Sequence, residues 1–219
     1  SGFDRQGAAD PKKQEEAVSL AKQADTVLLC LGLDELRESE GLDRADMALA
    51  ENQQQLLDAV ATVNPNVVVL LSAGAPVETP WAGRCKALVY GALGGQAGAG
   101  AAADILTGKL CPCGKLSQTW AKAYDDTPAK ANFGGEGRNV EYREGLYVGY
   151  RYYQTAGVKP AFPFGYGLSY TTFEYSGLKA DETGVTLTVT NTGSAAGAEI
   201  VQLYVAKPDA KVFRPEQEL

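Results

Sequence analysis

The sequence predicts an α/β fold, in which a mostly parallel sheet carries helices on both faces and a partial antiparallel β segment follows. Two short apolar runs, Thr26–Leu31 (TVLLCL) and Val67–Leu71 (VVVLL), have the composition of strands buried on both sides, which is typical of parallel sheets. A helical pattern of apolar residues precedes the first run, and another separates the two runs. Beyond residue 173 the pattern changes to alternating apolar and polar residues, which predicts antiparallel strands.

The elements of the parallel part follow one another at short intervals. A helix is expected over Pro11–Ala24, where a proline stands at an early helical position and apolar residues line one face. An apolar stripe predicts a second helix over Leu49–Val63, and Asn64-Pro65-Asn66 is the turn before the next strand. The remaining expected elements are a helical turn opened by Pro80-Trp81, a strand at Ala87–Tyr90, a helix from Gln96 to Leu106 and a strand at Lys115–Trp120.

The last third of the chain is aromatic and then β-rich. The segments Tyr142–Tyr153 and Phe162–Tyr170 are dense in tyrosine, which is typical of an irregular surface that covers a sheet edge or contacts another domain. Val185–Thr190 and Glu199–Val205 alternate and are expected to pair as a hairpin through the turn at Asn191-Thr192-Gly193. Because an isolated hairpin is at best marginally stable, we expect this β part to be incomplete.

Composition excludes several classes of function. A net charge of −7 argues against a nucleic-acid partner, which needs a basic surface. No membrane span is expected, because no stretch of about 18 apolar residues occurs. The chain has no histidine, which excludes Ser-His-Asp catalysis, Cys-His catalysis and histidine-ligated zinc within it. The polar N-terminus lacks the apolar core of a signal peptide, and its abrupt start also fits a fragment of a longer protein. A signal peptide would then lie outside this sequence, so the compartment is not predicted, with a cytoplasmic location slightly favoured over secretion.

Two short motifs match binding signatures in their letters but not in their context. Gly98–Ala103 (GAGAAA) satisfies the G-x-G-x-x-A dinucleotide pattern, yet no predicted strand runs directly into its first glycine. Cys111-Pro112-Cys113 lacks the two-residue spacing and the second thiol pair of a zinc knuckle. We therefore expect neither a cofactor nor a metal. A flavodoxin-like ligand-binding, phosphate-binding or scaffolding module remains the alternative to an enzyme.

The most distinctive stretch is an acidic loop, Gly32–Arg44 (GLDELRESEGLDR), which follows the first predicted strand. Open α/β sheets bind ligands at the C-terminal ends of their strands, which is where this loop would lie. Glu38 and Glu40 would point the same way in an extended chain, and two close carboxylates raise each other's pKa, as a proton donor requires. The pattern alone favours a solvated loop whose carboxylates pair with Arg37 and Arg44.

The ordered set of motifs resembles the C-terminal half of glycoside hydrolase family 3, of the β-glucosidase and β-xylosidase kind. The matching segments are ESEGLDR (38–44), NPNVVVLLSAGAPV (64–77), GGQAG and AADILTG (94–108), PCGKL (112–116), EGLYVGYRYY (144–153) and FPFGYGLSYTTFEY (162–175). They occur in the family's order and cover nearly the whole chain from about residue 24. The chain departs from the family at residues 111–114, where CPCG replaces the usual N-P-S-G.

The resemblance implies a division into an α/β-sandwich domain over residues 1–170, without the family's first strand, and an incomplete fibronectin-III-like domain over residues 171–219. In that family a (β/α)8 barrel carries an aspartate nucleophile, and the sandwich lends an acid/base glutamate to the same cleft. This chain would then be inactive alone. The glutamate of the E-G-x-D-R motif corresponds to Glu40, and because some members place it two positions earlier, Glu38 is the reserve candidate.

The resemblance also implies the partners of the chain. They are a β-linked glucoside or xyloside substrate and the barrel domain of the same enzyme, with assembly into a homo-oligomer left open. A retaining glycosidase needs an acid for the leaving oxygen and a nucleophilic carboxylate about 5–5.5 Å away. A glutamate on the acidic loop and an aspartate on a barrel strand would supply this pair. The sugar and the linkage depend mainly on barrel residues and are not predicted by this sequence.

Overall fold

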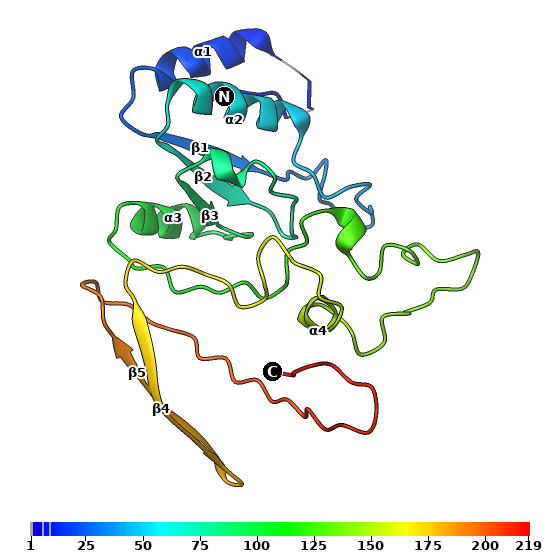
Figure 1. Ribbon diagram of the computed structural model, residues 1–219. Coiled ribbons are helices and arrows are strands. Elements are labelled where there is room, and N and C mark those ends of the chain that lie inside the picture. Colours follow the sequence, from blue (N-terminus) through cyan, green and yellow to red (C-terminus); the bar gives the residue numbers. More distant parts are fainter. Residues whose placement is uncertain (1, 6, 9) are drawn as a thin grey trace. The chain divides into compact units, whose positions relative to one another are not determined.

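The computed structural model describes residues 2–5, 7–8 and 10–219, which form two compact units (Figure 1). Unit 1 combines residues 1–98, 120–143 and 159–161, and unit 2 combines residues 99–119, 144–158 and 162–219. Ser1, Gln6 and Ala9 of the polar N-terminus lie outside the described residues. The predicted fold class is confirmed, since a parallel three-stranded sheet with helices accompanies a separate antiparallel two-stranded sheet. The domain boundary at residue 170 stays a prediction, because unit 2 contains residues from both sides of it.

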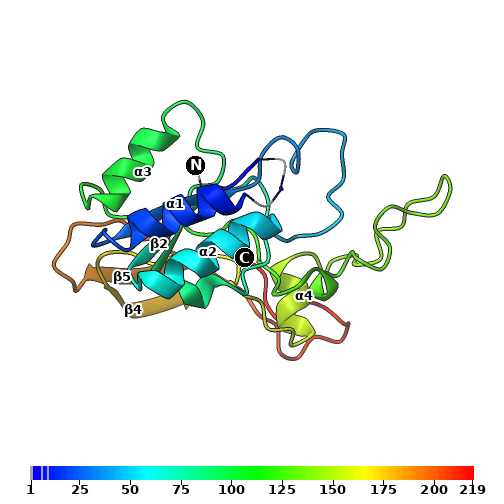
Figure 2. The ribbon, with the colours of Figure 1, turned by 90° about the horizontal axis from the view of Figure 1, so that it is seen from above.

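Unit 1 is built around a parallel sheet in the order β1-β2-β3. Its strands are β1 (Val27–Gly32), β2 (Val67–Ser72) and β3 (Ala87–Tyr90). Helices α1 (Pro11–Ala21) and α2 (Glu51–Val63) lie side by side on this sheet (Figure 2). The core of the unit consists of alternate β2 residues and one face of α2: Val67, Val69 and Leu71 from the strand, and Leu56, Leu57 and Val60 from the helix.

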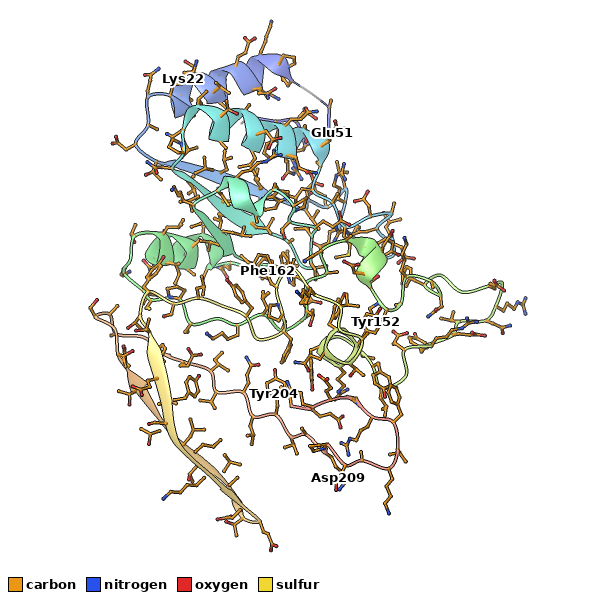
Figure 3. The ribbon with its side chains drawn as sticks, in the orientation of Figure 1. Lys22, Glu51, Tyr152, Phe162, Tyr204 and Asp209 are labelled. Atoms are coloured by element: carbon orange, nitrogen blue, oxygen red, sulfur yellow. The ribbon has the colours of Figure 1, made fainter. Side chains whose placement is uncertain are left out.

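The helices of unit 1 begin and end where the sequence supplies backbone partners. The carboxylate of Asp10 caps α1 by accepting a hydrogen bond from the Lys13 amide at 3.1 Å, and proline opens the helix. At the far end of α2, the Asn64 side chain donates to the carbonyls of Ala21 and Ala24 at 2.9 and 2.7 Å. Figure 3 labels Lys22 after α1 and Glu51 at the start of α2, which lie at opposite ends of the helical layer.

Burial of β1 on both faces was a wrong prediction. Leu29 and Leu31 are buried, but Leu28 is 47% exposed and Cys30 is also exposed. β1 is an edge strand of the sheet, and its side chains alternate between the face covered by α2 and the opposite face. An apolar run therefore predicted the strand correctly without revealing which of its faces is covered.

The strand expected at Lys115–Trp120 is also absent from the described residues. In unit 2, the Leu116 amide donates to the Tyr166 carbonyl at 2.8 Å, and the Leu116 carbonyl accepts from the Gly165 amide at 2.8 Å. In unit 1, the Trp120 ring is 1% exposed and meets the Tyr90 ring edge-on, with 4.9 Å between centroids. The alternating residues of Lys115–Trp120 are thus held by separate contacts of Leu116 and Trp120, and they do not form a β-strand. Two 3₁₀ turns complete unit 1, η1 (Ala82–Arg84), where a helical turn was expected, and η2 (Tyr124–Asp126).

Unit 2 contains a hairpin of β4 (Phe173–Asp181) and β5 (Gly184–Asn191). The predicted pairing of 185–190 with 199–205 was wrong, because β5 pairs with β4 instead. The Asp181 carboxylate accepts from the Thr183 amide at 2.7 Å and so closes a tight turn, which favours the preceding strand as the partner. Within the described residues, 199–205 forms no strand, and Val205 makes one isolated bridge with Glu218.

The helices of unit 2 are α3 (Gly98–Leu106), whose first residue belongs to unit 1, and α4 (Tyr150–Thr155). α4 was not expected, because the aromatic segment was interpreted as irregular. The Tyr150 ring stacks on Phe164 with 5.2 Å between centroids and meets Tyr204 edge-on at 5.6 Å. Figure 3 labels Tyr152 on α4 and Tyr204 on the C-terminal segment. No helix among the described residues is long and apolar enough to cross a membrane.

Candidate functional site

The acidic loop leaves the sheet at the C-terminal end of β1, as the sequence predicted. Gly32, the last residue of β1, is paired with Ser72, the last residue of β2. Because the two strands are parallel, the segments that follow them leave the sheet at the same edge. The loop therefore runs beside residues 72–78, in the part of unit 1 where α/β sheets place their ligand sites (Figure 1).

The buried side chain of Gln53 on α2 fixes the start of the loop. Its Nε2 donates to the Gly32 carbonyl at 2.9 Å, and its Oε1 accepts from the Gly32 amide at 2.9 Å. Both backbone groups of an edge-strand residue are thereby satisfied. Gly32 also has no room for a side chain, since a Cβ there would lie 2.0 Å from the Ser72 carbonyl oxygen. The first residue of the loop is thus held in one place by α2 and β2.

We expect Gln53→Leu to lower the free energy of unfolding by about 2–3 kcal/mol, because it leaves two backbone groups of Gly32 without this partner while keeping the side-chain volume. Urea unfolding followed by circular dichroism measures the change. Gln55→Leu is the matched control, because Gln55 is exposed on the same helix and donates to Glu51. Equal midpoints for the two variants would contradict the role given to Gln53.

Four hydrogen bonds join the acidic loop and the residues just after it, 33–47, to the end of β2 and the segment that follows it, 72–78. In order along the loop, they link the Leu33 amide to the Ser72 carbonyl (2.9 Å), Glu38 Oε2 to the Gly74 amide (2.8 Å), Arg44 Nη1 to the Pro76 carbonyl (3.1 Å) and the Met47 carbonyl to the Glu78 amide (2.7 Å). The loop is therefore fastened along its length and is not a freely solvated connection.

Glu40 lies at the tip of a tight turn between the second and third of these bonds. Ser39 and Leu42 form an antiparallel bridge, and Gly41 has a φ of +77°, which a glycine adopts without strain. Glu40 is exposed, whereas Glu38 is half-buried. The extended geometry that the sequence suggested for the two glutamates is replaced by this turn, so they occupy different environments.

The charge of Glu38 affects the pKa values of two neighbouring side chains, Arg44 and Tyr90. Burial lowers the pKa of the half-buried Arg44 guanidinium, and the carboxylate of Glu38 is the strongest opposing influence, followed by Asp46. The pKa of Tyr90 is raised, first by burial and then by the Glu38 charge. The Tyr90 hydroxyl donates to the Ala73 carbonyl at 2.8 Å. Glu38 therefore belongs to an ordered polar cluster.

An open cavity of about 330 Å³ lies beside the loop in unit 1. Its polar lining consists of three arginines and two aspartates, Arg5, Arg37, Arg44, Asp43 and Asp46. Neither candidate glutamate lines it. The cavity is thus a feature of the loop base, and Glu40 stands apart from it at the turn.

The two short motifs that match binding signatures lie in α3 and in the segment that follows it. Gly98–Ala103 makes the first turns of α3, and the preceding strand, β3, has already ended at Tyr90. The Cys111 Sγ lies 3.1 Å from the Ser169 Oγ, and the Cys113 thiol is exposed. Across residues 2–5, 7–8 and 10–219, no group of three His, Cys, Asp or Glu side chains could hold a metal ion.

Comparison with known proteins assigns the family. The sequence model described as "Glycosyl hydrolase family 3 C-terminal domain" matches residues 5–170. The chain belongs to glycosyl hydrolase family 3. Among curated members of the family, it is 47% identical over 218 residues to thermostable beta-glucosidase B of Acetivibrio thermocellus, covering 96% of this chain and 29% of that protein. It is 46% identical over 217 residues to an exo-alpha-(1->6)-L-arabinopyranosidase of Bifidobacterium longum, with the same coverage of 96% and 29%.

Solved structures of family 3 enzymes have the same fold. The β-glucosidase of Bifidobacterium adolescentis is 47% identical with a TM-score of 0.96, covering 99% of this chain and 33% of that one. The β-glucosidase of Kluyveromyces marxianus in complex with glucose is 42% identical with a TM-score of 0.90, covering 96% and 26%. The chain thus spans about a third or less of these proteins, and its residues 5–170 match the model of the family's C-terminal domain.

Proposed function

We propose that this chain is the acid/base-contributing portion of a retaining β-glycosidase that hydrolyses terminal β-D-glucosyl or related residues. The observation that carries the proposal is the position of Glu40. It is the glutamate of the E-G-x-D-R motif, and it stands exposed at the tip of a turn that is fastened to the sheet edge on both sides. A carboxylate presented in this way can reach a substrate that another domain holds.

The proposed reaction has two steps that share Glu40. In the first, the Glu40 carboxylic acid gives its proton to the glycosidic oxygen while an aspartate of the barrel attacks the anomeric carbon, so that the C–O bond breaks and a glycosyl-aspartate forms. In the second, the Glu40 carboxylate takes a proton from water, which attacks the same carbon and releases the sugar and the aspartate. Two inversions give net retention at the anomeric centre.

The substrate class proposed is a β-linked glucoside or xyloside, bound mainly by the barrel. The two curated relatives described above differ in the sugar that their names specify, although both are nearly equally similar to this chain. This equality supports a division of labour in which the C-terminal portion supplies acid/base catalysis and the barrel selects the sugar.

We expect the isolated 219-residue chain to hydrolyse 4-nitrophenyl β-D-glucoside no faster than buffer, because the nucleophile is supplied by another domain. The full-length protein that contains the chain should hydrolyse it at an ordinary enzymatic rate. Circular dichroism of the isolated chain verifies that it is folded in the assay. Enzymatic turnover by the folded isolated chain would contradict the placement of the nucleophile outside it.

A further inference from the structure

The turn that carries Glu40 is held at its base by two side chains. Glu38 stands just before the turn and Arg44 just after it. Glu38 accepts from the Gly74 amide at 2.8 Å, and Arg44 donates to the Pro76 carbonyl at 3.1 Å. The two backbone partners, the Gly74 amide and the Pro76 carbonyl, are two residues apart on the segment after β2. Residues 39–43 therefore project from a base that is anchored on both sides to one stretch of chain.

The Glu38 carboxylate occupies the space that the absent side chain of Gly74 leaves open. A Cβ on Gly74 would lie 2.9 Å from Glu38 Oε1 and 2.9 Å from Leu93 Cδ1, both closer than van der Waals contact. Both atoms are ends of flexible side chains, so an alanine at position 74 would shift the Glu38 carboxylate and leave the backbone in place. The Glu38 carboxylate therefore packs directly against the backbone at Gly74.

The charge of Glu38 also favours the charged form of Arg44. The Arg44 guanidinium is half-buried, and its Nη2 is buried without a hydrogen-bond partner among the described residues. Glu38 exerts the strongest of the carboxylate influences on it. A half-buried cation is stable only where an opposite charge compensates for its lost hydration. Glu38 thus stabilises Arg44 as well as holding Gly74.

Glu40 is free where Glu38 is engaged. In the part of the chain that the structure describes, Glu40 makes no hydrogen bond or ion pair. A general acid must be within hydrogen-bond reach of the oxygen that it protonates. A carboxylate oxygen already bound to a backbone amide at 2.8 Å is poorly placed for that task.

We infer that Glu38 and Arg44 clamp the base of the turn and thereby position Glu40 for proton transfer, so that Glu38 is a positioning residue and not an alternative proton donor. This inference rests on the proposed function of Glu40. It replaces the view of Glu38 as a reserve acid/base with a role that the sequence motif does not suggest.

The test compares four variants of the full-length protein, Glu38→Ala, Glu38→Gln, Gly74→Ala and Glu40→Gln, on aryl β-glucosides with poor and good leaving groups. Glu38→Ala should lower kcat on the substrate with the poor leaving group by about 10–100-fold, because it removes a charge-assisted hydrogen bond to Gly74. Glu38→Gln keeps an oxygen that accepts from Gly74, so its kcat should recover to within about fivefold of the wild type. Azide should accelerate neither Glu38 variant, because Glu40 remains.

Gly74→Ala tests the same contact from the other side. Its methyl group should displace the Glu38 carboxylate and lower kcat to a similar extent as Glu38→Ala. The kcat of the double variant Glu38→Ala/Gly74→Ala should be no lower than that of the less active single variant, because both changes break the same interaction. Hydrogen–deuterium exchange should rise at residues 72–76 in Glu38→Ala and stay unchanged in Glu40→Gln. Additive losses and unchanged exchange would overturn the clamp.

The outcomes separate the clamp from the proposed function. If Glu38→Ala yields a glycosyl azide and Glu38→Gln is equally inactive, Glu38 is the acid/base and the clamp is wrong, while the glycosidase function stands. If Glu38→Ala and Glu38→Gln both keep the full kcat, the clamp is also overturned. If no variant at Glu38 or Glu40 affects turnover, the proposed function itself fails. Should Glu38→Ala not fold, Glu38→Gln and Gly74→Ala decide the question.

Discussion

Glu40→Gln in the full-length protein is expected to lower kcat by about 10²–10⁴-fold on β-glucosides with poor leaving groups, which is the usual contribution of general acid catalysis. The amide keeps the shape of the side chain and removes the proton that the leaving oxygen needs. A 2,4-dinitrophenyl leaving group departs without protonation, so formation of the glycosyl-enzyme should be nearly normal on that substrate. Stopped-flow measurement of the dinitrophenolate burst distinguishes this step from the slow hydrolysis that follows.

Glu35→Gln is the matched control for Glu40→Gln. Glu35 belongs to the same acidic loop and is exposed, but its carboxylate is paired with Arg5. Exposed ion pairs of this kind contribute little, so kcat should stay within about twofold of the wild type. Equal losses in the two variants would show that general acidity of the loop matters and that Glu40 has no special role.

Gly32→Ala is expected to have the largest effect on stability, a loss of about 3 kcal/mol or more in the free energy of unfolding. The new Cβ would lie 2.0 Å from the Ser72 carbonyl oxygen and 2.9 Å from its carbon, both backbone atoms of β2 that cannot move aside alone. The β1–β2 ladder would have to shift, and with it the Gln53 bonds that hold the loop. Urea unfolding measures the loss.

Gly83→Ala serves as the comparison for Gly32→Ala. Gly83 lies in η1 of the same unit, and a Cβ there meets no atom within 4 Å. The unfolding midpoint of this variant should change little or rise slightly, because alanine reduces the freedom of the unfolded chain. A Gly32→Ala protein as stable as Gly83→Ala would refute the close packing inferred at the start of the acidic loop.

The strands and helices of unit 1 were largely predictable because their signals are local. α2 and β3 formed where their periodicity and apolar runs indicated, with β3 at Ala87–Tyr90 as expected. Burial was less predictable, since the exposure of Leu28 depends on what covers the second face of β1. The partner of β5 was predicted wrongly because a turn closed by Asp181 competes with a longer connection that has a similar strand pattern.

The candidate site was predictable only in part. The acidic loop was visible from its charge, whereas the roles of Glu40 and Glu38 came from the resemblance to a family and remain proposals. The contacts that order the loop join distant residues, since Gln53 is 21 residues from Gly32 and Glu38 is 36 residues from Gly74. The sequence does not indicate which of the three consecutive glutamines, Gln53–Gln55, contacts Gly32, or which of the small residues at 72–75 contacts Glu38.

The most direct test of Glu40 as the acid/base is the product formed when azide is added to a Glu40→Gly variant of the full-length protein with 2,4-dinitrophenyl β-glucoside. Without the glutamate, water attacks the glycosyl-enzyme slowly, and a small anionic nucleophile needs no general base. We expect azide to accelerate turnover and to give β-glucosyl azide, identified by the anomeric coupling in its NMR spectrum. Turnover that azide does not change, with glucose as the product, would contradict the assignment.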